Sequence, residues 1–370
     1  MRLQSDVPLG ILLSGGLDSS LVVAAAAQSS AVPVKTFTIA LPGSALDEST
    51  HAATVAQHFS TEHHRLELDS SSLSVIDEIA PLVDEPLADS SLLPSFVVSR
   101  LTRRHVTVAL GGDGGDELFG GYRDYPQALT DQERWGGLPS EAFRLAANLA
   151  ARLPAGVRGR NRIASLKGGP LQQIIWGSPY FDVALRRRIL DKEFAAQLGA
   201  AIDAPERGLL ALFNEGKGPV DRMTRTHFGS ILPDDFLVKV DRASMAHGLE
   251  MRTPFLDHRL IEFCFSSVPD AWKVNGRQTR PLQKLLAKKW LPATLDLNRK
   301  QGFSIPLDQW LRAEPPGRLM ERFEALPEYL HRPEIHGLID GLHAGRANGA
   351  RLFALLMLAI ACRNLQAGTA

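Results

Sequence analysis

The stretch LLSGGLDSS, residues 12–20, decides the fold, because it directly follows the apolar run at residues 7–11. It places two glycines and three hydroxyl groups where a buried strand is predicted to end and a helix to begin. Gly15 and Gly16 permit a tight turn with positive φ, which leaves backbone N–H groups exposed at the helix N-terminus. The stretch therefore predicts an anion-binding loop, in which Ser14, Ser19 and Ser20 add further donors.

Asp18 stands in the first turn of the predicted helix, where its negative charge cannot attract a phosphate. A carboxylate beside a phosphate site fits a Mg²⁺ ligand, because Mg²⁺ bridges carboxylate and phosphate oxygens. Spacing excludes a Walker loop (GxxxxGK), a dinucleotide-binding GxGxxG and a nucleophile elbow GxSxG. A simple strand-to-helix turn with Ser14 as N-cap is the alternative interpretation.

Outward from this stretch, apolar or β-branched runs alternate with helix-like segments up to about residue 125. Predicted strands cover residues 7–13, 34–39, 64–68 and 107–110, and predicted helices cover residues 17–28, 49–59 and 92–104. This alternation predicts an α/β fold with a doubly wound parallel sheet. Beyond residue 130 no strand pattern returns, so we expect an α/β core at residues 1–150 and a mainly helical part at residues 151–370.

A second stretch, GGDGGDELFGG at residues 111–121, follows the predicted strand at 107–110. Six glycines there let the backbone and its acidic side chains approach a polyphosphate closely. In a doubly wound sheet the first and fourth strands lie together, so Ser14 and Gly111 should face one crevice. Asp18 and Asp116 could then share Mg²⁺. The alternative is a flexible acidic turn that caps a helix.

Composition narrows the classes of function. The 370 residues carry 41 basic and 41 acidic side chains, so no excess of positive charge suggests nucleic acid or an anionic membrane as a partner. Only two cysteines occur, without metal-type spacing, which predicts a cytoplasmic protein without structural zinc. The longest apolar stretch, residues 352–362, is too short to span a bilayer and predicts a buried C-terminal helix.

Residues 152–170, RLPAGVRGRNRIASLKGGP, are rich in glycine, proline and arginine. Such composition predicts a loop or a poorly ordered connection. We interpret its arginines as solvated, with a phosphate-binding role as the alternative.

Seven ordered motifs give the chain its resemblance to a known family. They are SDVPLGILLSGGLDSS at 5–20, TFTIALPG at 36–43, TEHHRLEL at 61–68, VDEPLADSSLLP at 83–94, VALGGDGGDELFGGY at 108–122, LVKVDRASMAHGLEMRTPFLD at 237–257 and RKQGFSIPLDQWL at 299–311. The loop at 14–20 resembles the pyrophosphate loop (PP-loop) of N-type ATP pyrophosphatases. The whole set resembles the C-terminal synthetase domain of class B, glutamine-dependent asparagine synthetases.

The resemblance implies a role for each matching residue. The adenosine would be cradled by Leu13, Ile39, Gly111 and Gly112, and the pyrophosphate held by Ser14, Gly15, Gly16, Asp18 and Ser19. Asp18 and Asp116 would ligate Mg²⁺. Asp113 matches an acid important for amide formation, whereas related lactam-forming synthetases have tyrosine there. Lys300 matches the lysine that contacts the phosphates, and Lys239, Asp241 and Arg242 are candidate substrate or interdomain contacts.

The resemblance implies a ligase that adenylates aspartate with ATP and Mg²⁺, releases pyrophosphate, and forms asparagine when ammonia displaces AMP. Two alternatives stay open: the same chemistry on another carboxylate, such as a sugar uronate or a peptide closed into a macrolactam, and a catalytically silent nucleotide-binding module. Family members carry an N-terminal glutaminase domain, whereas here Met1 is followed by Arg2 and the loop comes twelve residues later. We therefore expect that domain to be absent from this chain. Three explanations stay open: ammonia is used directly, a separate glutaminase subunit supplies it, or the chain is a fragment or a truncated gene product.

Overall fold

The structure is a computed structural model, and it describes residues 3–40, 47–67, 74–82, 84–299 and 305–368. The chain forms two compact units that alternate along the sequence. Unit 1 comprises Met1–Ser72, Ser91–Pro126 and His227–Ile305, and unit 2 comprises Leu73–Ser90, Gln127–Thr226 and Pro306–Ala370. Residues of the predicted helical part, 151–370, thus occur in both units.

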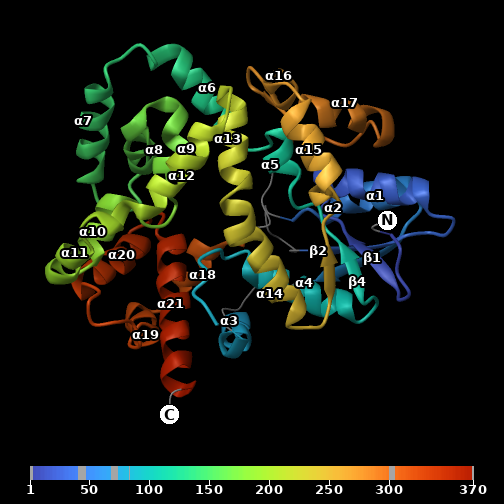
Figure 1. Ribbon diagram of the computed structural model, residues 1–370. Coiled ribbons are helices and arrows are strands. Elements are labelled where there is room, and N and C mark those ends of the chain that lie inside the picture. The colour runs from blue at the N-terminus through green and yellow to red at the C-terminus, as the bar shows by residue number, and fades with distance from the viewer. Residues whose placement is uncertain (1–2, 41–46, 68–73, 83, 300–304, 369–370) are drawn as a thin grey trace. The chain divides into compact units, whose positions relative to one another are not determined.

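A five-stranded parallel sheet forms the centre of unit 1, in the order β3-β2-β1-β4-β5. Figure 1 labels β1, β2 and β4 of this sheet. Its strands are β1 (Leu9–Leu12), β2 (Lys35–Ala40), β3 (Glu62–Glu67), β4 (Val108–Leu110) and β5 (Glu250–Arg252). Gly10 pairs with Lys35 on one side and with Ala109 on the other, which makes β1 and β4 neighbours. The predicted doubly wound parallel sheet is confirmed, and so is the adjacency of its first and fourth strands.

The strand β5 was not predicted, because no strand was expected beyond residue 130. It pairs in parallel with β4, and Met251 lies opposite Ala109. Its three residues, Glu-Met-Arg, include two charged side chains and lie at the edge of the sheet. A strand this short, with one apolar side chain, leaves no periodic pattern in the sequence. A two-stranded antiparallel pair, β6 (Val274–Asn275) and β7 (Gln278–Thr279), was equally undetectable.

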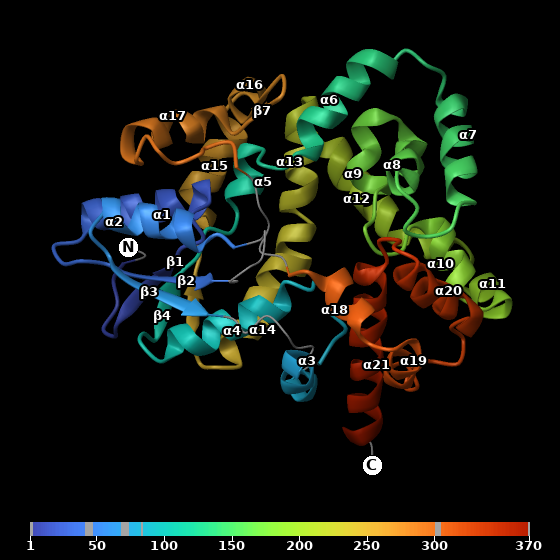
Figure 2. The ribbon, with the colours of Figure 1, turned by 180° about the vertical axis from the view of Figure 1, so that it is seen from behind.

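Helices cover both faces of this sheet, as Figures 1 and 2 show. On one face, α1 (Leu17–Ser29), α2 (Ser49–His58) and α17 (Pro281–Trp290) bury apolar side chains against Ile11 and Leu13. The opposite face carries α4 (Leu92–Arg103) and α14 (Val238–Met245), beside a cluster that contains Phe37 and Ala109. The remaining helical elements are α5 (Gly115–Phe119), a π-helical turn at Leu232–Leu237, a 3₁₀ turn at Pro254–Leu256, α15 (His258–Ser266) and α16 (Asp270–Lys273).

Unit 2 is built from helices and short turns. Its helices are α3 (Ser74–Ile79), α7 (Ser140–Ala151), α8 (Arg160–Ser165), α9 (Gln173–Trp176), α10 (Val183–Ile189), α11 (Lys192–Leu198), α12 (Ala204–Glu215), α18 (Leu307–Ala313), α19 (Pro316–Arg322), α20 (Arg332–His343) and α21 (Gly349–Gly368). Its 3₁₀ turns are Ala80–Leu82, Leu166–Gly168, Pro170–Gln172 and Gly199–Asp203. Two further helices, α6 (Asp124–Trp135) and α13 (Pro219–Phe228), contain the borders between the units.

The apolar stretch at residues 352–362 lies within α21 and packs on α18 and α20. Leu352 and Phe353 are fully buried, so the predicted buried C-terminal helix is confirmed. The helix is longer than the apolar stretch, and by length and composition alone it could cross a membrane. Half of its most apolar window is buried inside the protein, as in the core helix of a folded unit.

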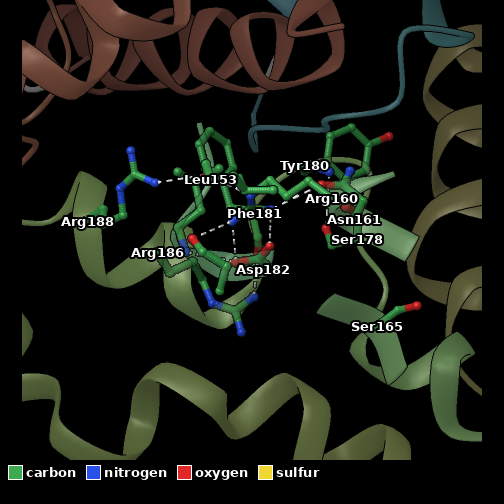
Figure 3. Close-up of polar contacts among 12 residues, drawn as sticks. Leu153, Arg160, Asn161, Ser165, Ser178, Tyr180, Phe181, Asp182, Arg186 and Arg188 are labelled. Carbon is green, nitrogen blue, oxygen red and sulfur yellow. Dashed lines mark hydrogen bonds and ion pairs between the residues drawn. The ribbon is translucent and has the colours of Figure 1, made fainter. Parts of the chain in front are cut away.

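The arginine-rich segment at 152–170 is partly helical and not a simple loop. Arg152, Arg158 and Arg162 are exposed, as predicted, but Arg160 is not solvated. The segment contains α8, at whose first residue Arg160 is completely buried and forms an ion pair with Asp182 (Figure 3). The Arg160 Nε group also donates to the carbonyl oxygen of Leu153 at 3.2 Å. Burial is the largest single effect on the Asp182 carboxyl and would raise its pKa. The hydrogen bonds from Arg160 and from the Leu185 N–H group, together with the positive charges of Arg160 and Arg351, outweigh burial and lower the pKa. Composition could not reveal a partner 22 residues further along the chain.

Candidate active site

The loop after β1 adopts a shape that its own hydroxyl groups stabilise. The Ser14 and Ser19 Oγ atoms lie 3.0 Å apart, and the Gly16 N–H group donates to Ser14 Oγ at 3.2 Å. Ser19 Oγ in turn donates to the Gly16 carbonyl oxygen at 3.2 Å. Gly15 has a φ of +78°, and a Cβ there would lie only 2.6 Å from the backbone nitrogen of Ala52. Both the conformation and the close approach of α2 therefore require glycine at this position.

A second glycine loop, after β4, lies directly against the first. A Cβ on Gly112 would approach the Ser19 backbone nitrogen to 3.1 Å, and a Cβ on Gly115 would approach Asp18 Cγ to 2.7 Å. Gly111, at the start of the second loop, is held by the edge strand β5. Its N–H group donates to the carbonyl oxygen of Arg252 at 2.9 Å. The structure thus brings the carboxyl ends of β1 and β4 together, as the strand order requires.

Two of the predicted acids converge on one cation. Arg280 Nη1 donates to Asp18 Oδ2 at 2.7 Å and to Asp116 Oδ1 at 3.0 Å. Asp18 Oδ1 also accepts a hydrogen bond of 2.9 Å from Gln283 Nε2. Arg280 and Gln283 are each only 3% exposed. The pair of carboxylates is therefore held from α17, a helix of the predicted helical part, which packs on α1.

Sequence reasoning missed Arg280 and Gln283, because both lie in an ordinary charged segment, RQTRPLQKLL, without a glycine cluster. A weak signal was present. Pro281 is typical of the first position of a helix, which places Arg280 at the N-cap, where serine, threonine, aspartate or asparagine is preferred. A cation is uncommon at a position that favours a small polar acceptor, but the sequence does not identify its partner.

The third acid, Asp113, lies in the same loop, with Oδ2 close to Gly111. Burial raises the pKa of its carboxyl, while the positive charge of Lys239 acts in the opposite direction. Lys239 is 8% exposed on α14, where its ammonium lies 4.6 Å from the centre of the Phe236 ring. Phe236 belongs to the π-helical turn, a local distortion that often occurs at functional sites. The positive charge of Lys239 therefore acts on the loop that carries Asp113.

Glu117, the acid that follows Asp116 in the loop, belongs to a buried polar cluster. Tyr122 donates a short hydrogen bond from its hydroxyl to Glu117, whose side chain is almost fully buried. Burial raises the pKa of Glu117 to about 7. The Tyr125 hydroxyl lies 2.8 Å from His227 Nδ1, and burial lowers the pKa of that imidazole to about 4. Glu117 and Tyr122 are in the quoted motif, but their contact was not predicted.

The residues predicted to cradle adenosine lie at the ends of three adjacent strands. Leu13 and Ile39 are buried after β1 and within β2, and Gly111 and Gly112 follow β4. Lys300 lies outside the described residues. Its neighbour Arg299 forms an ion pair of 2.8 Å with Glu48.

The donor set fits a divalent cation that also binds phosphate. Mg²⁺ in proteins typically takes one or two carboxylates and completes its shell with water and phosphate oxygens. Asp18 and Asp116 already direct one oxygen each to a single positively charged nitrogen. Within the described parts of the chain, no group of three or more His, Cys, Asp or Glu side chains could hold a metal ion. A pair of carboxylates therefore suits a Mg²⁺ ion that is also bound by a nucleotide better than it suits a metal ion held by protein ligands alone.

Comparison with known proteins adds independent evidence. The family model described as asparagine synthase matches residues 1–363. Asparagine synthetase (glutamine-hydrolyzing) 1 of Bacillus subtilis (strain 168) is 29% identical over 361 residues, which cover 95% of this chain and 55% of that protein. Asparagine synthetase (glutamine-hydrolyzing) 3 of Arabidopsis thaliana is 35% identical over 145 residues, which cover 36% of this chain and 25% of that protein. The chain spans about half the length of the curated relatives that it matches over most of its own length.

Proposed function

Because the chain belongs to the asparagine synthase family, we propose that it is an AMP-forming carbon–nitrogen ligase that converts aspartate, ATP and ammonia to asparagine, AMP and pyrophosphate. One observation carries the proposal. Two glycine loops, at the carboxyl ends of adjacent strands, bring Asp18 and Asp116 to a single cation. Backbone N–H groups at the start of α1 and a pair of carboxylates nearby suit a metal-bound polyphosphate.

The proposed reaction has two steps. A side-chain carboxylate oxygen of aspartate attacks the α-phosphorus of ATP, and the bond to the β-phosphate oxygen breaks to release pyrophosphate. Ammonia then attacks the acyl carbon, loses a proton, and displaces AMP. Adenylation turns a poor leaving group into a good one.

Each residue of the loops has a proposed role in these steps. Ser14, Gly15, Gly16 and Ser19 bind pyrophosphate, while Leu13, Ile39, Gly111 and Gly112 enclose adenosine. Asp18 and Asp116 hold Mg²⁺, which when bound supplies positive charge to the departing phosphate oxygens. Lys300 contributes a second positive charge there. Asp113, an acid beside Lys239, serves the amide-forming step.

The nitrogen source is a separate part of the proposal. The relatives are named as glutamine-hydrolysing, and the chain spans about half their length. We propose that the synthetase site accepts ammonia directly, or from a glutaminase that is not within these residues. We also place the protein in the cytoplasm, without a nucleic acid or membrane partner.

Exchange of radiolabelled pyrophosphate into ATP tests the first step. The purified chain with Mg²⁺, ATP and aspartate should catalyse exchange, and Asp18→Asn should abolish it while the protein stays folded. Glutamate, a uronate and a peptide carboxylate, tested in parallel, identify the acceptor. Exchange with another acid but not aspartate would move the proposal to that acid. Absence of exchange with every acid would favour a silent nucleotide-binding module.

A further inference from the structure

Arg280 has a backbone conformation that is uncommon for its residue type. Its φ of +55° lies in the left-handed region, which glycine and asparagine occupy far more readily. Local strain of this kind persists only where the surrounding structure fixes it. The backbone is fixed here, since Arg280 N–H donates to the Lys273 carbonyl oxygen at 2.7 Å. The consequence is a guanidinium aimed at two carboxylates from the start of α17.

Gln283 supports the same arrangement from one turn further along α17. Its Nε2 group holds Asp18 Oδ1 at 2.9 Å, so the two oxygens of Asp18 are bound by two different side chains of that helix. Gln283 Oε1 and Arg280 Nε are both buried and have no hydrogen-bond partner among the described residues. Buried polar atoms without partners are costly, which indicates that this arrangement is completed by a ligand or by a rearrangement.

We propose that Arg280 is an internal counter-cation, which holds Asp18 and Asp116 in place before metal binds and which a divalent cation has to displace. This inference rests on the proposed role of the two carboxylates as metal ligands. Arg280 Nη1 lies 2.7 and 3.0 Å from the two oxygens, whereas Mg²⁺ binds oxygen at about 2.1 Å. A metal ion bound to these same oxygens would lie against Nη1, and the two positive charges would repel each other.

Displacement of Arg280 links metal binding to nucleotide binding. Without nucleotide, a metal ion competes with a buried guanidinium and binds weakly. A metal–polyphosphate complex carries the negative charge of the phosphates. This charge compensates the positive charges of both the metal ion and Arg280. By reciprocity, whatever the polyphosphate adds to metal affinity the metal adds to polyphosphate affinity. Arg280 therefore favours loading of both ligands together over loading of metal alone.

Binding of Mn²⁺ to the nucleotide-free chain tests this inference. Arg280→Asn removes the charge and keeps a residue that tolerates positive φ. We expect Arg280→Asn to bind Mn²⁺ at least about tenfold more tightly than the wild type, the scale on which a neighbouring opposite charge shifts a carboxylate equilibrium. Free Mn²⁺ is measured by electron paramagnetic resonance. Lys288→Gln, an exposed charge removed from the same helix, is the matched control and should leave the affinity unchanged.

A purely structural role for Arg280 predicts the opposite result, because a loosened site binds metal less tightly. Equal or weaker Mn²⁺ binding by folded Arg280→Asn overturns the inference. If that variant does not fold, Arg280→Lys replaces it: lysine has a shorter reach, so Mn²⁺ should still bind more tightly than in the wild type, and no gain overturns the inference. Asp18→Asn separates the two proposals. If it leaves wild-type Mn²⁺ binding intact, the carboxylates are not the metal site and the proposed function loses its metal ligands.

Discussion

Gly115 offers the most direct test of the contact between the two glycine loops. It is the first residue of α5, and a Cβ there would lie 2.7 Å from Asp18 Cγ and closer still to Asp18 Oδ1. Ordinary contacts begin at 3.4 Å, so in Gly115→Ala the Asp18 carboxylate has to move by at least about 0.7 Å. A misplacement of about 1 Å can cost about 100-fold in rate. We therefore expect the variant to lose about 10- to 100-fold in the rate of aspartate-dependent pyrophosphate release.

The fold should survive this change, because overpacking costs about 1–3 kcal/mol and alanine is a better helix former than glycine. Gly337→Ala in α20 is the matched control, since a Cβ there meets nothing within 4 Å. Initial rates of pyrophosphate release, with circular dichroism to verify folding, compare the two variants. Wild-type rates and an unchanged Mg²⁺ dependence in Gly115→Ala would refute the reasoning that the loops hold Asp18 at a functional position.

Three further predictions concern Lys300, the buried ion pair of unit 2 and the imidazole beside Tyr125. Lys300→Ala should stay folded and lose at least about 100-fold in the rate of pyrophosphate release, because the positive charge proposed to contact the phosphates is lost; retained turnover would remove this lysine from the reaction. Asp182→Asn should lower the free energy of unfolding in urea by about 3–5 kcal/mol, because Arg160 stays buried without its counter-charge; a change under about 1 kcal/mol would contradict this. Burial lowers the pKa of His227 to about 4, so between the unfolded value near 6.5 and pH 4 only the unfolded chain takes up the proton. Stability should fall by about 2 kcal/mol from pH 7 to pH 5 through this group, and His227→Asn should remove that part of the loss; identical pH profiles for both proteins would contradict the assignment.

The two glycine loops could be predicted because their signals are local. An apolar run, a glycine pair and an acid within a few residues define each loop, and the rules for doubly wound sheets then place β1 beside β4. The same reasoning predicted that Asp18 and Asp116 meet. This prediction did not depend on knowing the contact partner of any individual side chain.

Arg280 could not be found in this way. Its hydrogen bond to Asp18 joins residues 262 positions apart, and a single arginine before a proline resembles many solvated helix starts. Arg160 was misinterpreted for a related reason: the composition of its segment indicates solvent, whereas the partner that permits its burial lies elsewhere in the sequence. The strand β5 escaped because a three-residue edge strand carries no period.

Nitrogen transfer from labelled ammonium to asparagine tests the central claim most directly. The purified chain is incubated with ATP, Mg²⁺, aspartate and nitrogen-15 ammonium, and the products are identified by mass spectrometry. We expect labelled asparagine in a one-to-one ratio with AMP and pyrophosphate, and none with Asp18→Asn. Pyrophosphate and AMP without labelled amide, or no aspartate-dependent turnover at all, would contradict the claim that this site makes asparagine.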